Sequence, residues 1–153
     1  MIYQWKDASY IKVDATVAGR MCEELEATVG LSAKTLLDAN RADDAPLHNE
    51  FEWNDNVAAE KYRLNQARHI INCLVVTRDS TEPQRMFFNI EKSDSQYFSV
   101  DAIMRRTDTR EKLLKMALGE LHAFSVKYAA LEELAKVFEA IDSVSDASNE
   151  GGA

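Results

Sequence analysis

The sequence predicts an α+β fold that is mostly helical and carries a small antiparallel sheet. Apolar residues recur at helical spacing in three segments between residues 14 and 72. The pattern then changes to short apolar runs at residues 73–77, 85–90 and 97–100, which are typical of strands. A seven-residue repeat of apolar residues follows within residues 108–142 and predicts one long helix.

Size and charge limit the classes of function. A chain of 153 residues with 46% apolar residues is long enough to bury a core without disulfides or metals. The formal net charge of −8 argues against non-specific coating of nucleic acid or anionic membrane, because such binding depends mainly on basic side chains. Any contact with DNA must therefore be local.

The N-terminal third predicts a hairpin and two helices. Residues 2–5 and 10–13 are β-prone and flank a link of turn-forming residues, which predicts a small hairpin. Asp14 is the expected cap of a helix that ends at Gly30, and Ser32 is the expected cap of a shorter helix that ends near Arg41. The connection that follows is expected to be ordered by three large apolar residues, Leu47, Phe51 and Trp53.

A third helix is predicted over residues 56–72, directly after the segment 52–55. Its apolar side carries Val57, Leu64, Ala67 and Ile71, and Glu60 falls on that side beside Arg63. The opposite side carries four residues without any acid, and we call them the polar arc: Lys61, Asn65, Arg68 and Asn72. Arg and Lys can donate hydrogen bonds to guanine and Asn can pair with adenine, so the polar arc suits readout of the DNA major groove. The alternative interpretation is an ordinary solvated helix face.

The predicted order of elements up to residue 100 is that of a winged helix-turn-helix. The second and third helices form its helix-turn-helix, the first strand joins the wing strands, and residues 77–84 form the wing tip. The connection of residues 41–54 is longer than in a tight helix-turn-helix. Five further residues are candidates to hold DNA phosphates: Lys34, Thr35, Arg41, Arg78 and Arg85. Taken singly, each is also explained as a scattered surface residue.

The long helix is predicted to start at Asp108, with Glu111 completing a capping box. Its repeat predicts a homodimer whose interface is formed by Leu114, Ala117, Leu121, Phe124, Tyr128, Leu131 and Phe138. Docking onto a different protein, or packing back onto its own domain, are the alternatives. The predicted organisation is a winged-helix-like domain at residues 1–100, a helical oligomerisation arm at 101–142 and a solvated, disordered tail at 143–153.

The sequence predicts neither a catalytic site nor a metal site or cofactor, and we expect a protein that is not an enzyme. Five acids of the segment 43–55 lack the regular spacing of a calcium loop and favour solvated or capping roles. The three histidines are scattered, and Cys22 and Cys73 lie within apolar runs, as expected for core residues in a reducing cytosol. The N-terminus lacks a secretion signal, and no apolar run approaches the length of a membrane span, so a cytoplasmic location without membrane contact is expected.

The segment from Ala45 to Ile71, with Pro-Leu-His-Asn-Glu-Phe-Glu-Trp-Asn-Asp and Ala-Ala-Glu-Lys-Tyr-Arg-Leu-Asn-Gln-Ala-Arg-His-Ile-Ile, resembles a family of small proteins of tailed bacteriophages and prophages. Members usually read Phe-Glu-Trp-Asp-Asp, so Asn54 departs from the pattern. Residues 111–142, with Ala-Leu-Gly-Glu-Leu-His-Ala-Phe, are similar to the same family. The resemblance implies a phage origin and a role inside an infected host cell, but it carries no functional residue over to this chain.

Two functions follow as hypotheses. The first is a phage-encoded DNA-binding protein, a regulator or a DNA-organising or packaging accessory, that acts as a dimer and reads bases with the polar arc. The second is a non-enzymatic protein that binds or inhibits a host protein through its acidic surface and its long helix.

Overall fold

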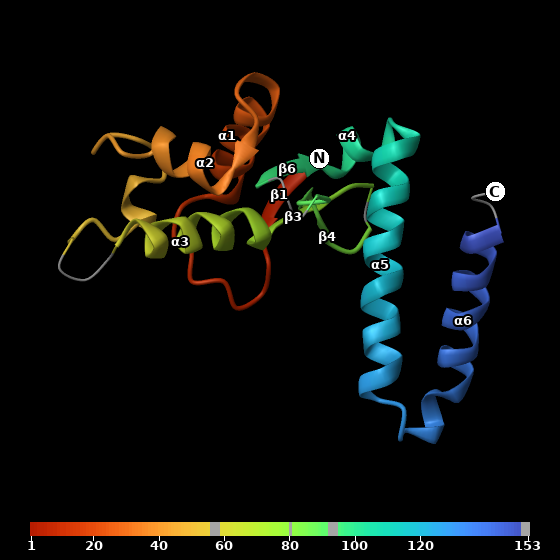
Figure 1. The fold of residues 1–153 in the computed structure, drawn as a ribbon. Coiled ribbons are helices and arrows are strands. Elements are labelled where there is room, and N and C mark those ends of the chain that lie inside the picture. Colours follow the sequence, from red (N-terminus) through yellow and green to blue (C-terminus); the bar gives the residue numbers. More distant parts are fainter. Residues whose placement is uncertain (56–58, 80, 92–94, 151–153) are drawn as a thin grey trace. The chain divides into compact units, whose positions relative to one another are not determined.

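The computed structural model describes residues 1–55, 59–79, 81–91 and 95–150. The chain divides into two compact units, Met1–Arg105 and Arg106–Ala153. The first unit combines helices with small antiparallel sheets, and the described part of the second is helical, so the α+β, mostly helical class is confirmed (Figure 1). The observed division falls after Arg105, whereas the predicted one fell at residue 100.

The first strand, β1 (Ile2–Trp5), pairs antiparallel with β3 (Leu74–Thr77), with Ile2 opposite Thr77 and Trp5 opposite Leu74. The predicted hairpin between residues 2–5 and 10–13 is therefore wrong. Residues 10–13 form no strand. The carboxylate of Glu50 accepts hydrogen bonds from the backbone N–H groups of Lys12 and Val13 at 3.1 and 2.9 Å, which satisfies donors that a strand partner would otherwise take.

Helix α1 (Ala15–Thr28) begins and ends as predicted. The side chain of Asp14 accepts a hydrogen bond from the Thr16 N–H at 2.7 Å. Gly30 takes the left-handed conformation, with φ of 86°, and its N–H donates to the Leu25 carbonyl at 2.8 Å. The Tyr3 ring lies directly against Gly19, where an added Cβ would come within 2.4 Å of the ring. This contact allows α1 to pack closely on β1.

The short strand β2 (Leu31–Ser32) leads into α2 (Ala33–Ala39), where Ser32 and Thr35 form the predicted cap as a reciprocal capping box. The segment after α2 contains a 3-10 turn, η1 (His48–Glu50), and two of its expected anchors, Leu47 and Phe51, are buried. The fully buried side chain of Asn40 donates to the Leu36 carbonyl at 2.8 Å and accepts from the Leu47 N–H at 2.9 Å. One buried amide thus ties the end of α2 to the connection.

Helix α3 (Glu60–Cys73) follows, and Ala59 before it has an extended backbone. The predicted start at residues 56–58, including Val57, lies outside the described residues. Ala67 and Ile71 are buried as predicted, together with Ile70, and Leu64 is half-buried. Helix α3 packs directly on α2, and Figure 1 shows the two helices next to each other.

Two sheets complete the unit, with strand orders β1-β3-β4 and β2-β6-β5. The predicted strand at 85–90 is divided into β4 (Gln84–Arg85) and β5 (Phe87–Phe88), since β4 pairs with β3 whereas β5 pairs with β6 (Gln96–Ser99). Met86, which is 1% exposed, lies between β4 and β5 and contacts both sheets. Its N–H donates to the Leu74 carbonyl of β3 at 3.3 Å, and its carbonyl accepts from the N–H of Val100, the residue after β6, at 2.7 Å. A short helix, α4 (Val100–Met104), ends the unit.

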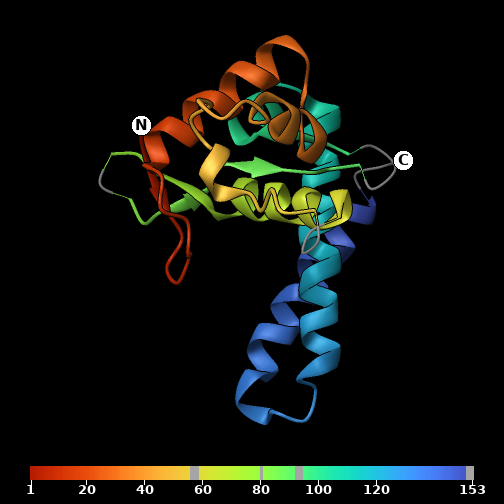
Figure 2. The ribbon, with the colours of Figure 1, turned by 90° about the vertical axis from the view of Figure 1, so that its left-hand side faces the viewer.

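The second unit is a helical hairpin of α5 (Thr107–Lys127) and α6 (Ala135–Glu150), joined through a 3-10 turn, η2 (Glu132–Leu134). The two helices run side by side in Figures 1 and 2. A single helix over residues 108–142 is thus wrong. A lone helix gains little from an exposed apolar stripe, whereas folding back brings the Phe138 ring of α6 to 6.3 Å from the Phe124 ring of α5.

Two details at the ends of this hairpin also differ from expectation. The N-cap of α5 is Arg106, and Asp108 lies in the first turn, where its carboxylate pairs with the Arg106 guanidinium at 3.0 Å. The predicted disordered tail is wrong for residues 143–150, which belong to α6.

Among the described residues, no helix has the combination of length and hydropathy that crossing a bilayer requires.

Candidate nucleic-acid interface

Helix α3 is fixed on its inner side by polar contacts as well as by the core. The Arg63 side chain is only 9% exposed; its Nε donates to the Glu52 carbonyl at 2.9 Å, and its guanidinium pairs with Asp55 and Glu60. The Gln66 amide donates to the Glu50 carbonyl at 3.3 Å and accepts from the Glu52 N–H at 3.1 Å. These contacts set the rotation of α3 about its axis and so decide which residues face outward.

All four residues of the polar arc are exposed. The Arg68 guanidinium donates to the Asn65 side chain at 2.8 Å, and no described carboxylate forms an ion pair with Lys61 or Arg68. Glu60 does not neutralise the polar arc, since it pairs with Arg41 and Arg63 instead. The predicted arrangement of charges on α3 is therefore present.

Arg85 extends the polar arc onto the sheet. Its guanidinium donates to the side-chain oxygen of Asn72 at 2.5 Å, its Nε donates to the Phe87 carbonyl at 3.0 Å, and it lies 4.9 Å from the centre of the Phe88 ring. All of these partners are neutral, so none of them offsets the positive charge of Arg85. Together, the polar arc and Arg85 form a surface that we call the basic face.

The other predicted phosphate contacts are engaged elsewhere. Lys34 pairs with Asp38, Arg41 pairs with Asp38 and Glu60, and Arg78 holds both carboxylate oxygens of Asp101 at 2.7 Å. The Lys34 ammonium, helped by Arg41, holds the pKa of Asp38 below its ordinary value. The Thr35 hydroxyl belongs to the cap of α2 and donates to the Gly30 carbonyl at 2.8 Å. These four residues are not part of the basic face.

The acids of the segment 43–55 cap and pair rather than cluster. Glu50 accepts from two backbone N–H groups, Glu52 accepts from the Asn54 N–H at 2.9 Å, and Asp55 pairs with Arg63. The described residues contain no group of three or more His, Cys, Asp or Glu side chains that suits a metal ion.

Both cysteines are free and buried. Burial raises the pKa of the Cys22 thiol to about 12. Burial also raises the pKa of Cys73, against the opposing effect of Lys6 and Arg85. Neither thiol is therefore activated, although Cys73 Sγ lies 3.6 Å from the His69 ring nitrogens.

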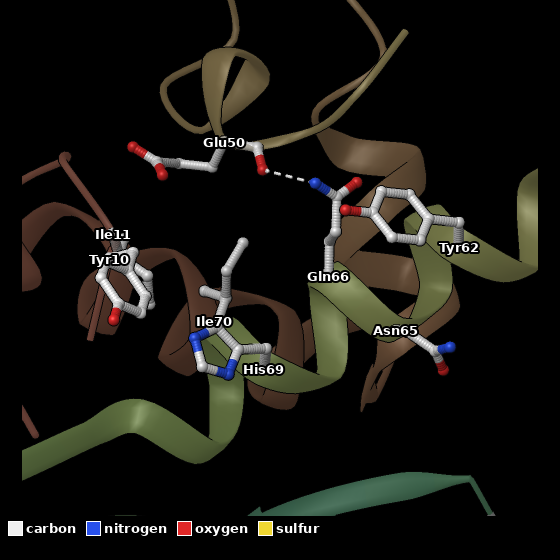
Figure 3. Close-up of a pocket in the computed structure, with 8 residues that line it drawn as sticks. All are labelled: Tyr10, Ile11, Glu50, Tyr62, Asn65, Gln66, His69 and Ile70. Atoms are coloured by element: carbon white, nitrogen blue, oxygen red, sulfur yellow. Dashed lines mark hydrogen bonds between the residues drawn. The ribbon is translucent and has the colours of Figure 1, made fainter. Parts of the chain in front are cut away.

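A cleft of about 390 Å³ opens beside the basic face (Figure 3). One wall comes from the loop after β1, with Tyr10 and Ile11, and the other from α3. The α3 residues are Tyr62, Asn65, Gln66, His69 and Ile70, and Glu50 completes the lining. Only Asn65 was predicted as a site residue. The spacing of Tyr62, Gln66 and His69 on one helix side is a signal for the α3 wall, but nothing periodic marks Tyr10.

The predicted oligomer interface lies on the hairpin of α5 and α6. Leu114, Leu121, Phe124 and Leu131 remain 38–47% exposed, Ala117 is exposed, and Tyr128 and Phe138 are half-buried. The fold-back therefore covers the apolar stripe only in part.

No family model, no curated protein and no solved structure matches this chain.

Proposed function

We propose that this chain is a DNA-binding protein that reads the major groove with the basic face. The observation that carries the proposal is a contrast within the first unit. Arg41, Arg63 and Arg78 are ion-paired, whereas Lys61, Arg68 and Arg85 are exposed and have no ion-pair partner among the described carboxylates. In a chain of net charge −8, such a local concentration of unpaired cations suits a polyanion.

The mixture of side chains favours reading of bases over binding of phosphates alone. Two amides, Asn65 and Asn72, alternate with Lys61 and Arg68 along the exposed side of α3. Arg and Lys match the acceptors of guanine, and Asn matches the edge of adenine. Residues that serve only to neutralise phosphates have no need for this alternation.

A winged helix-turn-helix is the arrangement that we propose for the first unit. The sheet order β2-β6-β5 supports it, because a strand after the first helix then joins a hairpin that follows the third helix. In this arrangement the wing is the connection between β5 and β6 rather than the predicted tip at residues 77–84, where Arg78 is tied to Asp101. Residues 92–94 of that connection lie outside the described residues.

A dimer and a phage origin complete the proposal. The partly exposed apolar stripe of the hairpin supports self-association, which would set the spacing of two half-sites on DNA. The resemblance to small phage proteins supports a regulator, or a DNA-organising or packaging accessory, that acts in the host cytoplasm.

The test is a mobility shift with fragments of the genome that encodes the chain. The double variant Lys61→Ala/Arg68→Ala is expected to lose about 10²-fold or more in affinity, since two charge-assisted contacts disappear. A matched control is Arg106→Ala/Lys136→Ala, which removes the same charge from the second unit. Equal binding by wild type and the α3 double variant, or no binding by the wild type to any fragment, contradicts the proposal.

A second candidate function is binding of a host protein. The observation that favours it is the exposure of Leu114, Leu121 and Phe124 in an acidic chain. If the purified chain is monomeric at micromolar concentration and binds no DNA, this function is preferred. Cross-linking through positions 124 and 128 to one stoichiometric host protein is then the expected result.

A further inference from the structure

We infer that the cleft between the loop after β1 and α3 holds one unstacked nucleobase, so that the protein prefers DNA in which a base is unpaired. The inference rests on the proposed function, since it adds a base-binding site beside the basic face. It concerns residues outside the polar arc, apart from Asn65, which lines the cleft and also belongs to the polar arc.

The cleft has a size and a position that suit a base. Its volume of about 390 Å³ exceeds that of a purine ring system and leaves room for part of the sugar. Asn65 places it directly next to Arg68, to which Asn65 is hydrogen-bonded. A nucleotide whose phosphate contacts the basic face is therefore within reach of the cleft.

The lining offers both kinds of contact that an unstacked base requires. The rings of Tyr10, Tyr62 and His69 supply flat surfaces, and Tyr10 and Tyr62 are 90% and 52% exposed and thus open to a partner. Stacking of a base on such rings contributes about 1–3 kcal/mol. The Asn65 side-chain amide supplies N–H donors for a base edge, since among the described residues only its oxygen is bound, by Arg68, whereas the Gln66 amide is held by Glu50 and Glu52.

The loop that forms the outer wall is held in place. The Trp5 indole N–H donates to the Val13 carbonyl at 2.7 Å, and the Lys12 and Val13 N–H groups donate to the Glu50 carboxylate. These bonds also hold the Glu50 carboxylate against the backbone of the loop. Lys6 and Lys12 are exposed on the same loop and suit the flanking phosphates.

The test compares two DNA duplexes of one sequence, one fully paired and one with a single bulged thymine, by fluorescence anisotropy at one salt concentration. The wild type is expected to bind the bulged duplex about tenfold more tightly, which corresponds to about 1.4 kcal/mol. Tyr62→Leu is expected to reduce this ratio to about one. Tyr62→Phe keeps the ring and is expected to keep most of the preference. A ratio near one for the wild type, or an unchanged ratio in Tyr62→Leu, overturns the inference while the proposed function stands.

A second measurement tests the cleft without the basic face. Titration of the protein with adenosine, which has no phosphate, is followed by NMR up to about 10 mM, where weak stacking is detectable. Shifts are expected at the side-chain amides of Asn65 and Gln66 and at the Tyr62 ring, and they should disappear in Tyr62→Leu. Absence of these shifts overturns the base site. Their presence in a protein that binds no DNA contradicts the proposed function but supports the cleft.

Discussion

The guanidinium carbon of Arg63 lies 5.3 Å from the centre of the Trp53 ring. Trp53 in turn donates its indole N–H to the His48 carbonyl at 2.8 Å and stacks on the His48 ring at 4.8 Å. One buried arginine thus joins α3 to the connection that precedes it. The orientation of the basic face depends on this contact, although Arg63 itself points inward.

Replacement of Arg63 tests that dependence. Arg63→Met keeps the aliphatic bulk but leaves the Glu52 carbonyl without its donor and the Trp53 ring without its cation, so the free energy of unfolding is expected to fall by about 1–3 kcal/mol. Arg63→Lys keeps the charge but not the planar fork and should recover only part of that loss. Urea unfolding measures both variants. Full stability of Arg63→Met would show that core packing alone positions α3.

Arg85 offers a test of the proposed interface through salt dependence. Each phosphate contact contributes about −0.9 to the slope of log K against log salt concentration. Arg85→Ala is expected to make the slope shallower by about that amount, and Arg106→Ala, in the second unit, should leave it unchanged. Anisotropy titrations between about 50 and 200 mM salt give the slopes. An equal slope for Arg85→Ala and wild type would remove Arg85 from the interface.

Removal of the capping box at the start of α2 is expected to destabilise the fold. Ser32→Ala removes the acceptor of the Thr35 N–H, a hydrogen bond of 3.0 Å, in a residue that is 6% exposed. The expected decrease in the free energy of unfolding is about 1–2 kcal/mol. Ser125→Ala, whose hydroxyl donates to the His122 carbonyl on an exposed part of α5, serves as the comparison. Equal thermal midpoints for the two variants would contradict this role of Ser32.

The ion pairs of Asp38 are expected to make the free energy of unfolding depend on pH. Lys34 lowers the pKa of this carboxyl in the folded chain. A lowered folded pKa means that the ion pairs stabilise the fold above the ordinary carboxyl pKa, and that this contribution is lost as the pH falls through the lowered value. Asp38→Asn should therefore be less stable than wild type near neutral pH, and the difference should shrink at about pH 3. Urea unfolding at both pH values measures it, and a constant difference would refute the assignment.

The exposed apolar residues of the hairpin allow a test of the proposed self-association. Leu121 is 41% exposed, so Leu121→Asp is expected to fold but to weaken self-association by at least about tenfold, because it places a charge on the apolar stripe. Sedimentation equilibrium of both proteins gives the dissociation constants. A monomeric wild type at micromolar concentration would rule out the proposed dimer.

The local elements, and the side of α3 that faces outward, could be predicted from the sequence. Caps at Asp14 and Ser32, the stop at Gly30 and the exposure of Lys61 and Arg68 all follow from residue type and spacing, which act over a few neighbours. Long-range choices were missed. The residues of β1 pair with residues 69 to 75 positions away. The carboxylates that engage Arg41 and Arg78 include residues 19 and 23 positions away. No periodic pattern encodes such pairings.

The turn between α5 and α6 changes the geometry of any assembly built on this arm. A continuous helix over residues 108–142 would extend about 50 Å, whereas α5 alone spans about 30 Å. Two copies joined through their hairpins would form a four-helix bundle, not a two-stranded rod. Such a bundle would have the length of one hairpin helix, about 30 Å, rather than that of a continuous coiled coil.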